Sequence, residues 1–312
     1  MEFSHYPVML NECIDHLNIK PDGIYVDGTA GGGSHSEAIL KRLTTGKLIS
    51  IDQDDAAIDT CTKRFEQYKE RSILVKNNFS QLEQILNELN INHVDGVLLD
   101  LGVSSHQLDT PARGFSYNSD ARLDMRMDPR SPFSAYNVVN EYTEIELRNI
   151  IRDYGEEKFA SQIAKKIVLE RENKPIESTF ELAAIIKSAI PVAAARKEAQ
   201  HPAKRTFQAI RIEVNKELDV IKPAIDAAVN RLNDGGRIVI LTFHSLEDRI
   251  VKTVFNGYSQ GCICPKDFPI CICGNKPKLN IINKKPITAT NEELELNSRS
   301  KCAKLRVAER TI

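Results

Sequence analysis

The sequence predicts an α/β fold in which a doubly wound parallel sheet is interrupted by a helical insertion. Between residues 23 and 101, short runs rich in β-branched residues alternate with segments of helical periodicity, a pattern typical of a parallel sheet flanked by helices. The sheet pattern stops near residue 106 and returns in the apolar run RIVILTF at 237–243. We therefore expect a sheet domain built from both ends of the chain.

Four short apolar runs predict the first strands: 23–27 (GIYVD), 47–52 (KLISID), 72–75 (SILV) and 94–101 (VDGVLLDL). Buried parallel strands are usually short and apolar in this way. Between them, the segments 34–37 (SHSE) and 80–83 (SQLE) predict capping boxes that begin helices.

The middle of the chain loses the strand pattern. Residues 106–136 show neither the period of two that marks a strand nor the period of 3.6 that marks a helix. A loop of this length is usually functional or disordered. Helical periodicity returns after a capping box predicted at 143–146 (TEIE), and a long helix is predicted from about Ala203, with a disturbance at Pro223. Residues 304–309 (KLRVAE) predict a last strand. The expected domains are 1–105 and 206–312 for the two parts of the sheet domain, and 106–205 for the loop and the helical insertion.

Composition limits the class of protein. The chain has 312 residues, 41% of them hydrophobic and 27% charged, with a formal net charge of -1, as in soluble globular proteins of one large domain or two. No apolar run approaches the roughly 20 residues of a membrane span. Residues 1–18 lack the basic-then-apolar pattern of a signal peptide. We expect a cytoplasmic protein without a membrane partner.

The segment 26–35 (VDGTAGGGSH) is a glycine-rich turn between the first strand and the first helix. Glycines let the backbone approach a ligand, and the positive helix end favours a nucleotide-like cofactor at this switch point. The spacing differs from the G-x-G-x-x-G of dinucleotide folds, and Asp27 suits a cationic sulfonium better than a diphosphate. The turn therefore favours S-adenosylmethionine over NAD, and an oxidoreductase is the weaker alternative.

Polar side chains follow the next strands at the same edge. Asp52 ends the second strand, where a carboxylate can accept both ribose hydroxyls of an adenosine. Phe79 follows the third strand and either meets an adenine ring or joins the core; both alternatives stay open. Asp100 ends the fourth strand, beside the expected cofactor, where a methyl acceptor must lie. Its alternative role is to cap the following turn.

Several segments in order carry a specific resemblance: DGTAGGGSHS, IDQD, LLDLGVSSHQLD, RGFSY, LDMRMD, HPAKRTFQAIRI, FHSLEDRIVK and KLRVAER. The chain resembles, nearly end to end, the RsmH family, formerly called MraW. The resemblance implies a Rossmann-like class I S-adenosylmethionine-dependent methyltransferase sheet with an inserted helical substrate-recognition domain. It also implies that the product is N4-methylcytidine in the decoding region of 16S rRNA in the small ribosomal subunit.

Carried over position by position, the family's cofactor contacts are Gly33, Ser34, His35, Asp52, Phe79, Asp100 and Gln107. Ser34 departs from the Gly-Gly-His that relatives often have at this helix start, which a backbone contact would tolerate. Asp100 is also the predicted catalytic group, as acceptor for the amino hydrogens. The aromatic of the common Asp/Asn-Pro-Pro-Tyr/Phe motif is missing here. Stacking on the base is therefore expected from Phe115 or Tyr117, whose alternative role is to anchor the loop. His244 and Ser245 are further candidates, and their alternative role is to cap a helix or form a turn.

Affinity for RNA must come from local basic clusters, because the net charge is nearly zero. The candidate residues are Arg113, Arg122, Arg126 and Arg130 in the long loop; Lys197, His201, Lys204 and Arg205; and Arg299, Lys301, Lys304 and Arg306. The alternative for each cluster is a solvated surface.

Four of the seven cysteines form two C-x-C pairs, Cys262/Cys264 and Cys271/Cys273. Four thiols this close can bind one structural zinc ion, although C-x-x-C is the commoner spacing. Free thiols and a reversible disulfide stay open as alternatives, and we expect the cluster to lie outside the active site. A noncatalytic RNA-binding or assembly factor and a methyltransferase for another acceptor also stay open. So does the oligomeric state, with a homodimer as one alternative.

Overall fold

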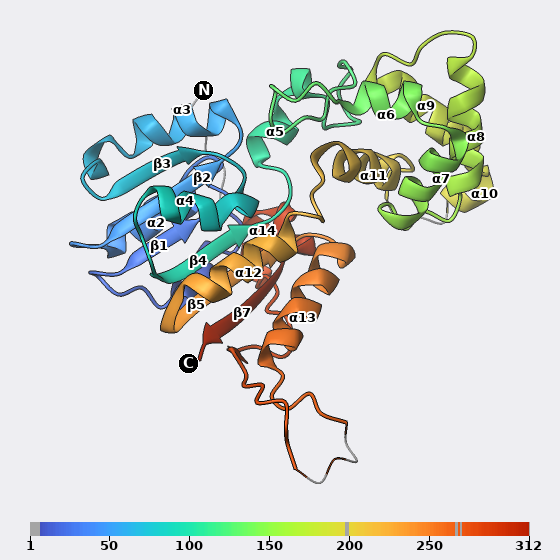
Figure 1. The fold of residues 1–312 in the computed structure, drawn as a ribbon. Coiled ribbons are helices and arrows are strands. Elements are labelled where there is room, and N and C mark those ends of the chain that lie inside the picture. Colours follow the sequence, from blue (N-terminus) through green and yellow to red (C-terminus); the bar gives the residue numbers. More distant parts are fainter. Residues whose placement is uncertain (1–6, 197–199, 266–267, 269, 312) are drawn as a thin grey trace. The chain divides into compact units, whose positions relative to one another are not determined.

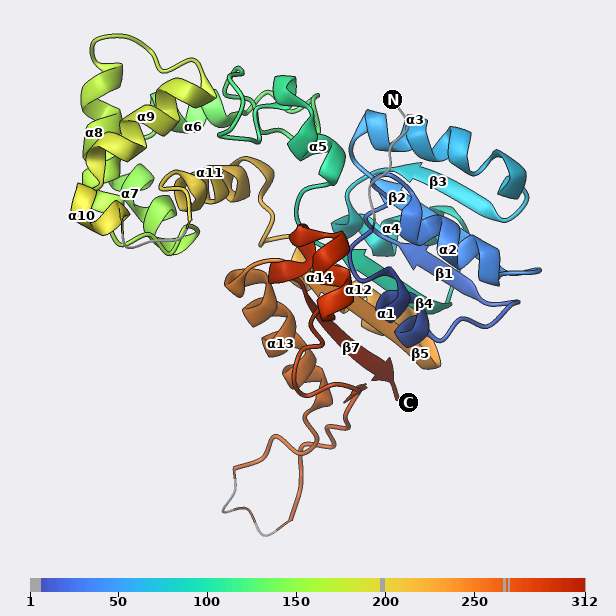
Figure 2. The ribbon, with the colours of Figure 1, turned by 180° about the vertical axis from the view of Figure 1, so that it is seen from behind.

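The computed structural model describes residues 7–196, 200–265, 268 and 270–311. The chain forms two compact units: unit 1 comprises Met1–Gly102 and Leu218–Ile312, and unit 2 comprises Val103–Glu217. The ribbons of Figures 1 and 2 show unit 1 in blue and orange-red and unit 2 in green and yellow. Unit 1 is thus built from both ends of the chain, and the chain passes from one unit to the other at residues 102/103 and 217/218, whereas the expected boundaries are 105/106 and 205/206.

Unit 1 contains a seven-stranded sheet with the order β3-β2-β1-β4-β5-β7-β6 among the described residues. Its strands are β1 Ile24–Asp27, β2 Lys47–Asp52, β3 Ser72–Lys76, β4 Val94–Asp100, β5 Leu232–Thr242, β6 Leu279–Ile281 and β7 Lys304–Arg310. Strands β1 to β5 run parallel, whereas β7 runs antiparallel to both β5 and β6. The predicted α/β class and Rossmann-like sheet are confirmed.

Helices cover both faces of this sheet. They are α1 Leu10–Leu17, α2 Ser34–Arg42, α3 Asp55–Arg64, α4 Leu82–Glu88, α12 Ile221–Arg231, α13 Ser245–Ser259 and α14 Asn291–Leu296, with short 3-10 turns η1 Glu66–Tyr68, η2 Phe79–Gln81 and η4 Ser298–Cys302. Successive residues of β1 show the two faces: Tyr25 packs in the cluster with α1 and α2, and Val26 packs in the cluster with α4 and α12. This alternation is what a doubly covered sheet requires.

Unit 2 is helical. Its elements are α5 Ser105–Asp109, η3 Pro111–Arg113, α6 Ala135–Glu141, α7 Glu144–Asp153, α8 Ala160–Arg171, α9 Thr179–Ala189, α10 Val192–Ala195 and α11 Lys204–Asn215. Its own apolar core draws on the loop as well as the helices, for example Leu123, Leu147 and Ile210. A backbone hydrogen bond holds the long loop against the segment that precedes α9: Leu123 N donates to Glu177 O at 3.0 Å.

The predicted helix starts were partly wrong. At 34–37 there is no capping box: α2 begins after Gly33, and Glu37 pairs with Arg64 at 2.6 Å. At 80–83 the turn η2 comes first, capped by Asn78, and α4 begins only at Leu82. The box at Thr143 and Glu146 is confirmed.

The single long helix predicted from Ala203 is also wrong. Helix α11 ends at Asn215, because Lys216 adopts a left-handed conformation (φ 50°) and its N–H donates to Ile212 O. Helix α12 begins at Ile221, so Pro223 lies in its first turn, where a missing N–H costs little. Among the described residues, no helix has both the length and the apolar character needed to cross a bilayer.

Candidate functional site in unit 1

Three aspartates are the last residues of three neighbouring strands: Asp27 of β1, Asp52 of β2 and Asp100 of β4. Strand β1 pairs with β2 on one side and with β4 on the other. Since the strands are parallel, their carboxyl ends meet at one edge, and the strand order reverses between β1 and β4. Open α/β sheets bind ligands at such a switch point.

The glycine-rich turn lies across this edge. Gly28 N donates to Leu98 O of β4 at 2.9 Å, and Ala30 N donates to Ile51 O of β2 at 2.9 Å. A Cβ added to Gly28 would lie 2.4 Å from Leu99 Cδ2, and one added to Gly33 (φ 81°) would lie 3.0 Å from the Phe65 ring. The turn is therefore a backbone surface that passes close over the neighbouring strands and that only glycine permits at these two positions.

Asp27 does not lie as predicted. Its side chain is fully buried, and it accepts hydrogen bonds from Thr29 N at 3.1 Å and from Ser36 Oγ at 2.7 Å. Burial raises the pKa of Asp27, against these hydrogen bonds and the nearby His35. The carboxylate fastens the turn to α2, whereas we expected it to face a cationic ligand.

Asp52 ties the glycine-rich turn to the end of β2. Its Oδ2 accepts from Gly31 N at 2.8 Å, and its Oδ1 accepts from Asp54 N at 2.9 Å. Burial raises the pKa of Asp52 to about 6, although both N–H groups oppose this. Each carboxylate oxygen keeps further acceptor capacity, so hydroxyl donors from a ribose would suit it.

Asp100 has an unsatisfied oxygen. Its Oδ1 is buried and has no hydrogen-bond partner among the described residues, whereas Oδ2 lies 3.9 Å from His35 Nδ1. Burial raises the pKa of Asp100 to about 6, with His35 opposing the shift and Asp27 adding to it. A buried acceptor without a donor is costly unless a ligand supplies one.

Two neighbours fix the position of Asp100. Thr29 Oγ1 accepts from Asp100 N at 2.7 Å and thereby links the ends of β1 and β4. His35 Nε2 lies 3.2 Å from Val8 O; because a carbonyl only accepts, this nitrogen carries a proton and the other ring nitrogen faces Asp100.

Arg64, at the end of α3, is a residue that the sequence did not single out. Its guanidinium donates to Gly32 O at 2.8 Å, to Ser34 Oγ at 3.2 Å and to Glu37 Oε2 at 2.7 Å. It thus holds the glycine-rich turn and the first turn of α2 together. A basic residue in the last turn of a helix is common, so no sequence signal marked this contact.

The position of Phe79 leaves open both of its predicted roles, contact with an adenine ring and packing in the core. It is partly buried against the sheet core, and its Cβ would lie 3.1 Å from a Cβ added to Gly28. Nearby, Asn77 N donates to Asp52 O at 3.0 Å, so the ends of β2 and β3 are fastened together.

The structure therefore brings Gly33, Ser34, His35, Asp52, Phe79 and Asp100 to one end of the sheet of unit 1. Gln107 belongs to unit 2, where it is buried and closes a capping box on α5: Gln107 Oε1 accepts from Ser104 N at 3.0 Å. Its role toward a cofactor stays a prediction.

The candidates for holding a base have different environments. Phe115 is only 5% exposed and belongs to the core of unit 2, so its predicted stacking role is wrong. Tyr117 stacks on His201 with ring centroids 4.5 Å apart. In unit 1, His244 Nε2 lies 3.1 Å from Glu247 Oε1, and Glu247 Oε2 accepts from Phe243 N at the start of α13.

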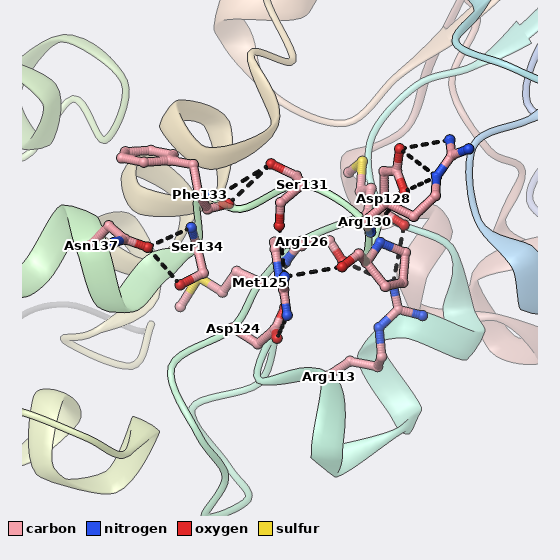
Figure 3. Close-up of polar contacts among 12 residues, drawn as sticks. Arg113, Asp124, Met125, Arg126, Asp128, Arg130, Ser131, Phe133, Ser134 and Asn137 are labelled. Atoms are coloured by element: carbon pink, nitrogen blue, oxygen red, sulfur yellow. Dashed lines mark hydrogen bonds and ion pairs between the residues drawn. The ribbon is translucent and has the colours of Figure 1, made fainter.

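The arginines of the long loop mostly bind the loop itself (Figure 3). Arg126 pairs with Asp124 at 2.6 Å and donates to the carbonyls of Pro129 and Ser131. Arg113 donates to Arg126 O at 2.8 Å. In unit 1, Arg306 pairs with Asp248 at 2.6 Å and is 6% exposed. These guanidinium groups hold the fold together, and carboxylates offset the charges of Arg126 and Arg306, so these two are less suited to RNA phosphates than predicted. Lys197 lies outside the described residues.

Comparison with known proteins gives full-length matches. The sequence profile of the MraW methylase family matches residues 2–311. A protein of Lachnospira eligens named ribosomal RNA small subunit methyltransferase H is 58% identical over 99% of this chain and 98% of its own length. A protein of the same name from Clostridioides difficile is 57% identical over 99% of this chain and 100% of its own length. A putative rRNA methylase structure from Clostridium thermocellum is more distant, with a TM-score of 0.47 and 12% identity over 98% of this chain and 99% of that one.

Proposed function

The chain belongs to the MraW methylase family, and from this premise we propose that it methylates the exocyclic N4 of a cytosine in the decoding region of 16S rRNA. The methyl donor is S-adenosylmethionine, and the substrate is rRNA in the small ribosomal subunit. The unpartnered Asp100 Oδ1 at the switch point of the sheet is the observation that carries the catalytic assignment. The names of the relatives support rRNA of the small subunit as the substrate.

The residues at the carboxyl edge fit this cofactor. The glycine-rich turn borders open space at Gly32, where an added Cβ would have no atom within 4 Å, and the start of α2 offers the positive end of a helix. Asp52 would accept the ribose hydroxyls, and Phe79 would border the adenine. The bound cofactor supplies an electrophilic methyl group on a sulfonium.

Asp100 would act on the amino group. The lone pair of a cytosine amine is delocalised into the ring, which makes the nitrogen a poor nucleophile. An acceptor that holds an amino hydrogen orients the nitrogen and steadies the positive charge that develops on it. With the cofactor bound, the amine nitrogen would lose one proton as it gains the methyl group and the sulfur leaves as a neutral thioether; the carboxylate of Asp100, with a pKa of about 6, is a suitable acceptor for that proton.

The decisive experiment is methyl transfer from tritiated S-adenosylmethionine to small ribosomal subunits from a strain that lacks the enzyme, followed by nucleoside mass spectrometry. We expect N4-methylcytidine with the native chain and a strong loss with Asp100→Asn. A methylated product at another atom would overturn the N4 assignment. If neither subunits nor free rRNA accept methyl groups while the cofactor binds, the rRNA substrate is wrong, and a different acceptor or a noncatalytic role in assembly replaces it.

A further inference from the structure

The described residues between α13 and β6 form no apolar core of their own. None of the described residues between 260 and 277 belongs to the buried clusters of unit 1. Instead, Ile263, Ile270 and Ile272 are 59%, 74% and 75% exposed. Hydrophobic burial therefore contributes little to the conformation of the described residues of this segment.

Four cysteine thiols gather inside it. The Sγ atoms of Cys262, Cys264, Cys271 and Cys273 all lie within 4.8 Å of one another. Two of the separations are 3.6 Å, between Cys271 and Cys273, and 3.8 Å, between Cys262 and Cys273. A tetrahedral zinc ion with bonds of about 2.3 Å places its sulfur ligands about 3.8 Å apart. A disulfide would need about 2.0 Å.

From this geometry we propose that the four cysteines bind one structural Zn²⁺ ion. Four thiolates in a tetrahedron are the donor set of closed structural zinc sites, which leave no position for a substrate. Magnesium and calcium prefer oxygen ligands and are excluded by the same donor set.

The backbone supports a set of thiolates. Ile263 N and Asn275 N donate to Cys273 Sγ at 3.4 and 3.5 Å, and Ile272 N donates to Cys264 Sγ at 3.4 Å. Donors of this kind orient metal ligands and favour their charged form.

The base of the segment is closed independently of the metal. Asn275 Nδ2 donates to Gln260 O at 2.9 Å and to Gly261 O at 2.6 Å, and Lys278 N donates to Tyr258 O at 2.7 Å. Zinc would therefore fix the part beyond this base, where its binding free energy replaces an apolar core. None of the four cysteines is a residue of the candidate methyl-transfer site.

The first test measures metal in the full chain, purified under reducing conditions from zinc-supplemented medium. Elemental analysis should find one zinc per chain, and Cys262→Ser/Cys264→Ser should lose it. The matched control is Cys302→Ser, because Cys302 is an exposed cysteine outside the cluster and should leave the zinc content unchanged. Less than a tenth of a zinc per chain, or iron in its place, would overturn the proposal.

The second test uses the native chain and does not depend on how the variants fold. A thiol reagent should modify Cys302 quickly and the four clustered cysteines slowly, and their modification should release zinc in step, as a chromogenic chelator reports. After zinc removal, limited proteolysis should cut within 260–277 while the circular dichroism of the helices persists. If all exposed thiols react at the rate of Cys302, or if the intact mass is two hydrogens lower for each disulfide formed, the cluster is a set of free or oxidised cysteines instead.

Discussion

The three aspartates that end β1, β2 and β4 have equivalent positions in the sheet but different roles. Asp27 has donors for both oxygens and fastens a turn, Asp52 accepts two backbone N–H groups, and Asp100 keeps a buried oxygen without a donor. Burying a carboxylate without enough donors lowers the stability of the fold. At Asp100 this loss would be offset if, as we propose, a bound ligand completes the hydrogen bonding.

Asp100→Asn should therefore separate activity from stability. The amide keeps the shape but cannot accept a proton from the amine, so we expect kcat for methyl transfer to fall about 100-fold. The same change should raise the free energy of unfolding at pH 8, because an uncharged amide is easier to bury. Glu88→Gln, at an exposed surface carboxylate, is the control and should change neither quantity. Equal loss of activity in both variants would contradict a specific role.

The pH dependence follows from the direction of the shift. The pKa of Asp100 is raised from 3.8 to about 6 in the folded chain, so the folded state binds the proton more tightly than the unfolded state. Burial of the charge therefore destabilises the fold fully above pH of about 6, and the effect disappears as the pH falls toward 4. The stability advantage of Asp100→Asn should shrink over that range in urea titrations. Native kcat/KM should fall below a pH of about 6; a flat profile from pH 5 to 8 would exclude an ionised Asp100 from the reaction.

The glycine-rich turn allows a matched pair of substitutions. Gly33 has a left-handed conformation, and an added Cβ would meet Phe65 and Cys61 at 3.0 to 3.1 Å. Gly33→Ala should lower the free energy of unfolding by about 1–2 kcal/mol. Gly32→Ala should be almost neutral, since an added Cβ there has no atom within 4 Å. Urea unfolding of both variants without cofactor measures the difference, and equal effects would show that the turn is not strained at Gly33.

Helices and strands can be predicted from the sequence where a local pattern of residues alone determines them. The strands ending at Asp27, Asp52 and Asp100 follow from short apolar runs, and the Thr143 box follows from two residues three apart. The capping box predicted at 34–37 does not form because a residue far along the chain competes for its carboxylate. Arg64 pairs with Glu37, whose carboxylate the box would need. The break at Lys216 has no Gly or Pro to mark it, so the helical period alone predicts one helix where there are two.

Two Asp-x-Arg pairs, Asp124/Arg126 and Asp128/Arg130, stabilise the long loop of unit 2 (Figure 3). The two arginines differ in how far they are exposed. Arg126 is 25% exposed and holds Asp124 together with two carbonyl groups, whereas Arg130 is 61% exposed and pairs with Asp128. Although burial opposes it, hydrogen bonds from Arg126 keep the pKa of Asp124 below its ordinary value. This contribution to stability is present at neutral pH and is lost on acidification.

Arg126→Lys should loosen this loop, because an ammonium cannot reproduce the planar fork. We expect faster proteolysis between residues 124 and 131 at neutral pH. Arg130→Lys makes the same replacement in the more exposed Asp-x-Arg pair. The protease should cleave this variant at nearly the native rate, because exposed ion pairs contribute little to stability. Similar cleavage of both variants would mean that Arg126 is no more important than a surface residue.

For the whole molecule, the sequence predicts the sheet class, the helical insertion and the strand-end carboxylates. It does not show that Gln107 is buried in a capping box, that Arg64 binds the glycine-rich turn, or that Phe115 belongs to a core. These facts depend on contacts between residues far apart in the chain, which periodicity and spacing do not record. The pattern of residues 304–309 predicts the strand β7, but it does not predict that this strand runs antiparallel to β5.

The two cores should respond differently to the cofactor product, S-adenosylhomocysteine. At 100 times its dissociation constant, a ligand stabilises the state that binds it by about 2.7 kcal/mol. Hydrogen exchange should slow in the turn at 28–36 and around Asp52, while α7 to α9 of unit 2 exchange as before. Slower exchange at 104–109 would support the predicted Gln107 contact. NAD is the control, and equal protection by NAD would favour a dinucleotide site.

The division of unit 1 at residues 102/103 and 217/218 also decides the order in which the chain can fold during synthesis. Unit 2 is continuous, so all its core residues have been made before β5 leaves the ribosome. At that moment β1 to β4 exist without β5 and β7, and β4 still exposes an unpaired edge. The inserted unit can thus fold first, domain by domain, whereas the sheet of unit 1 is completed only after β5 and β7 have been made.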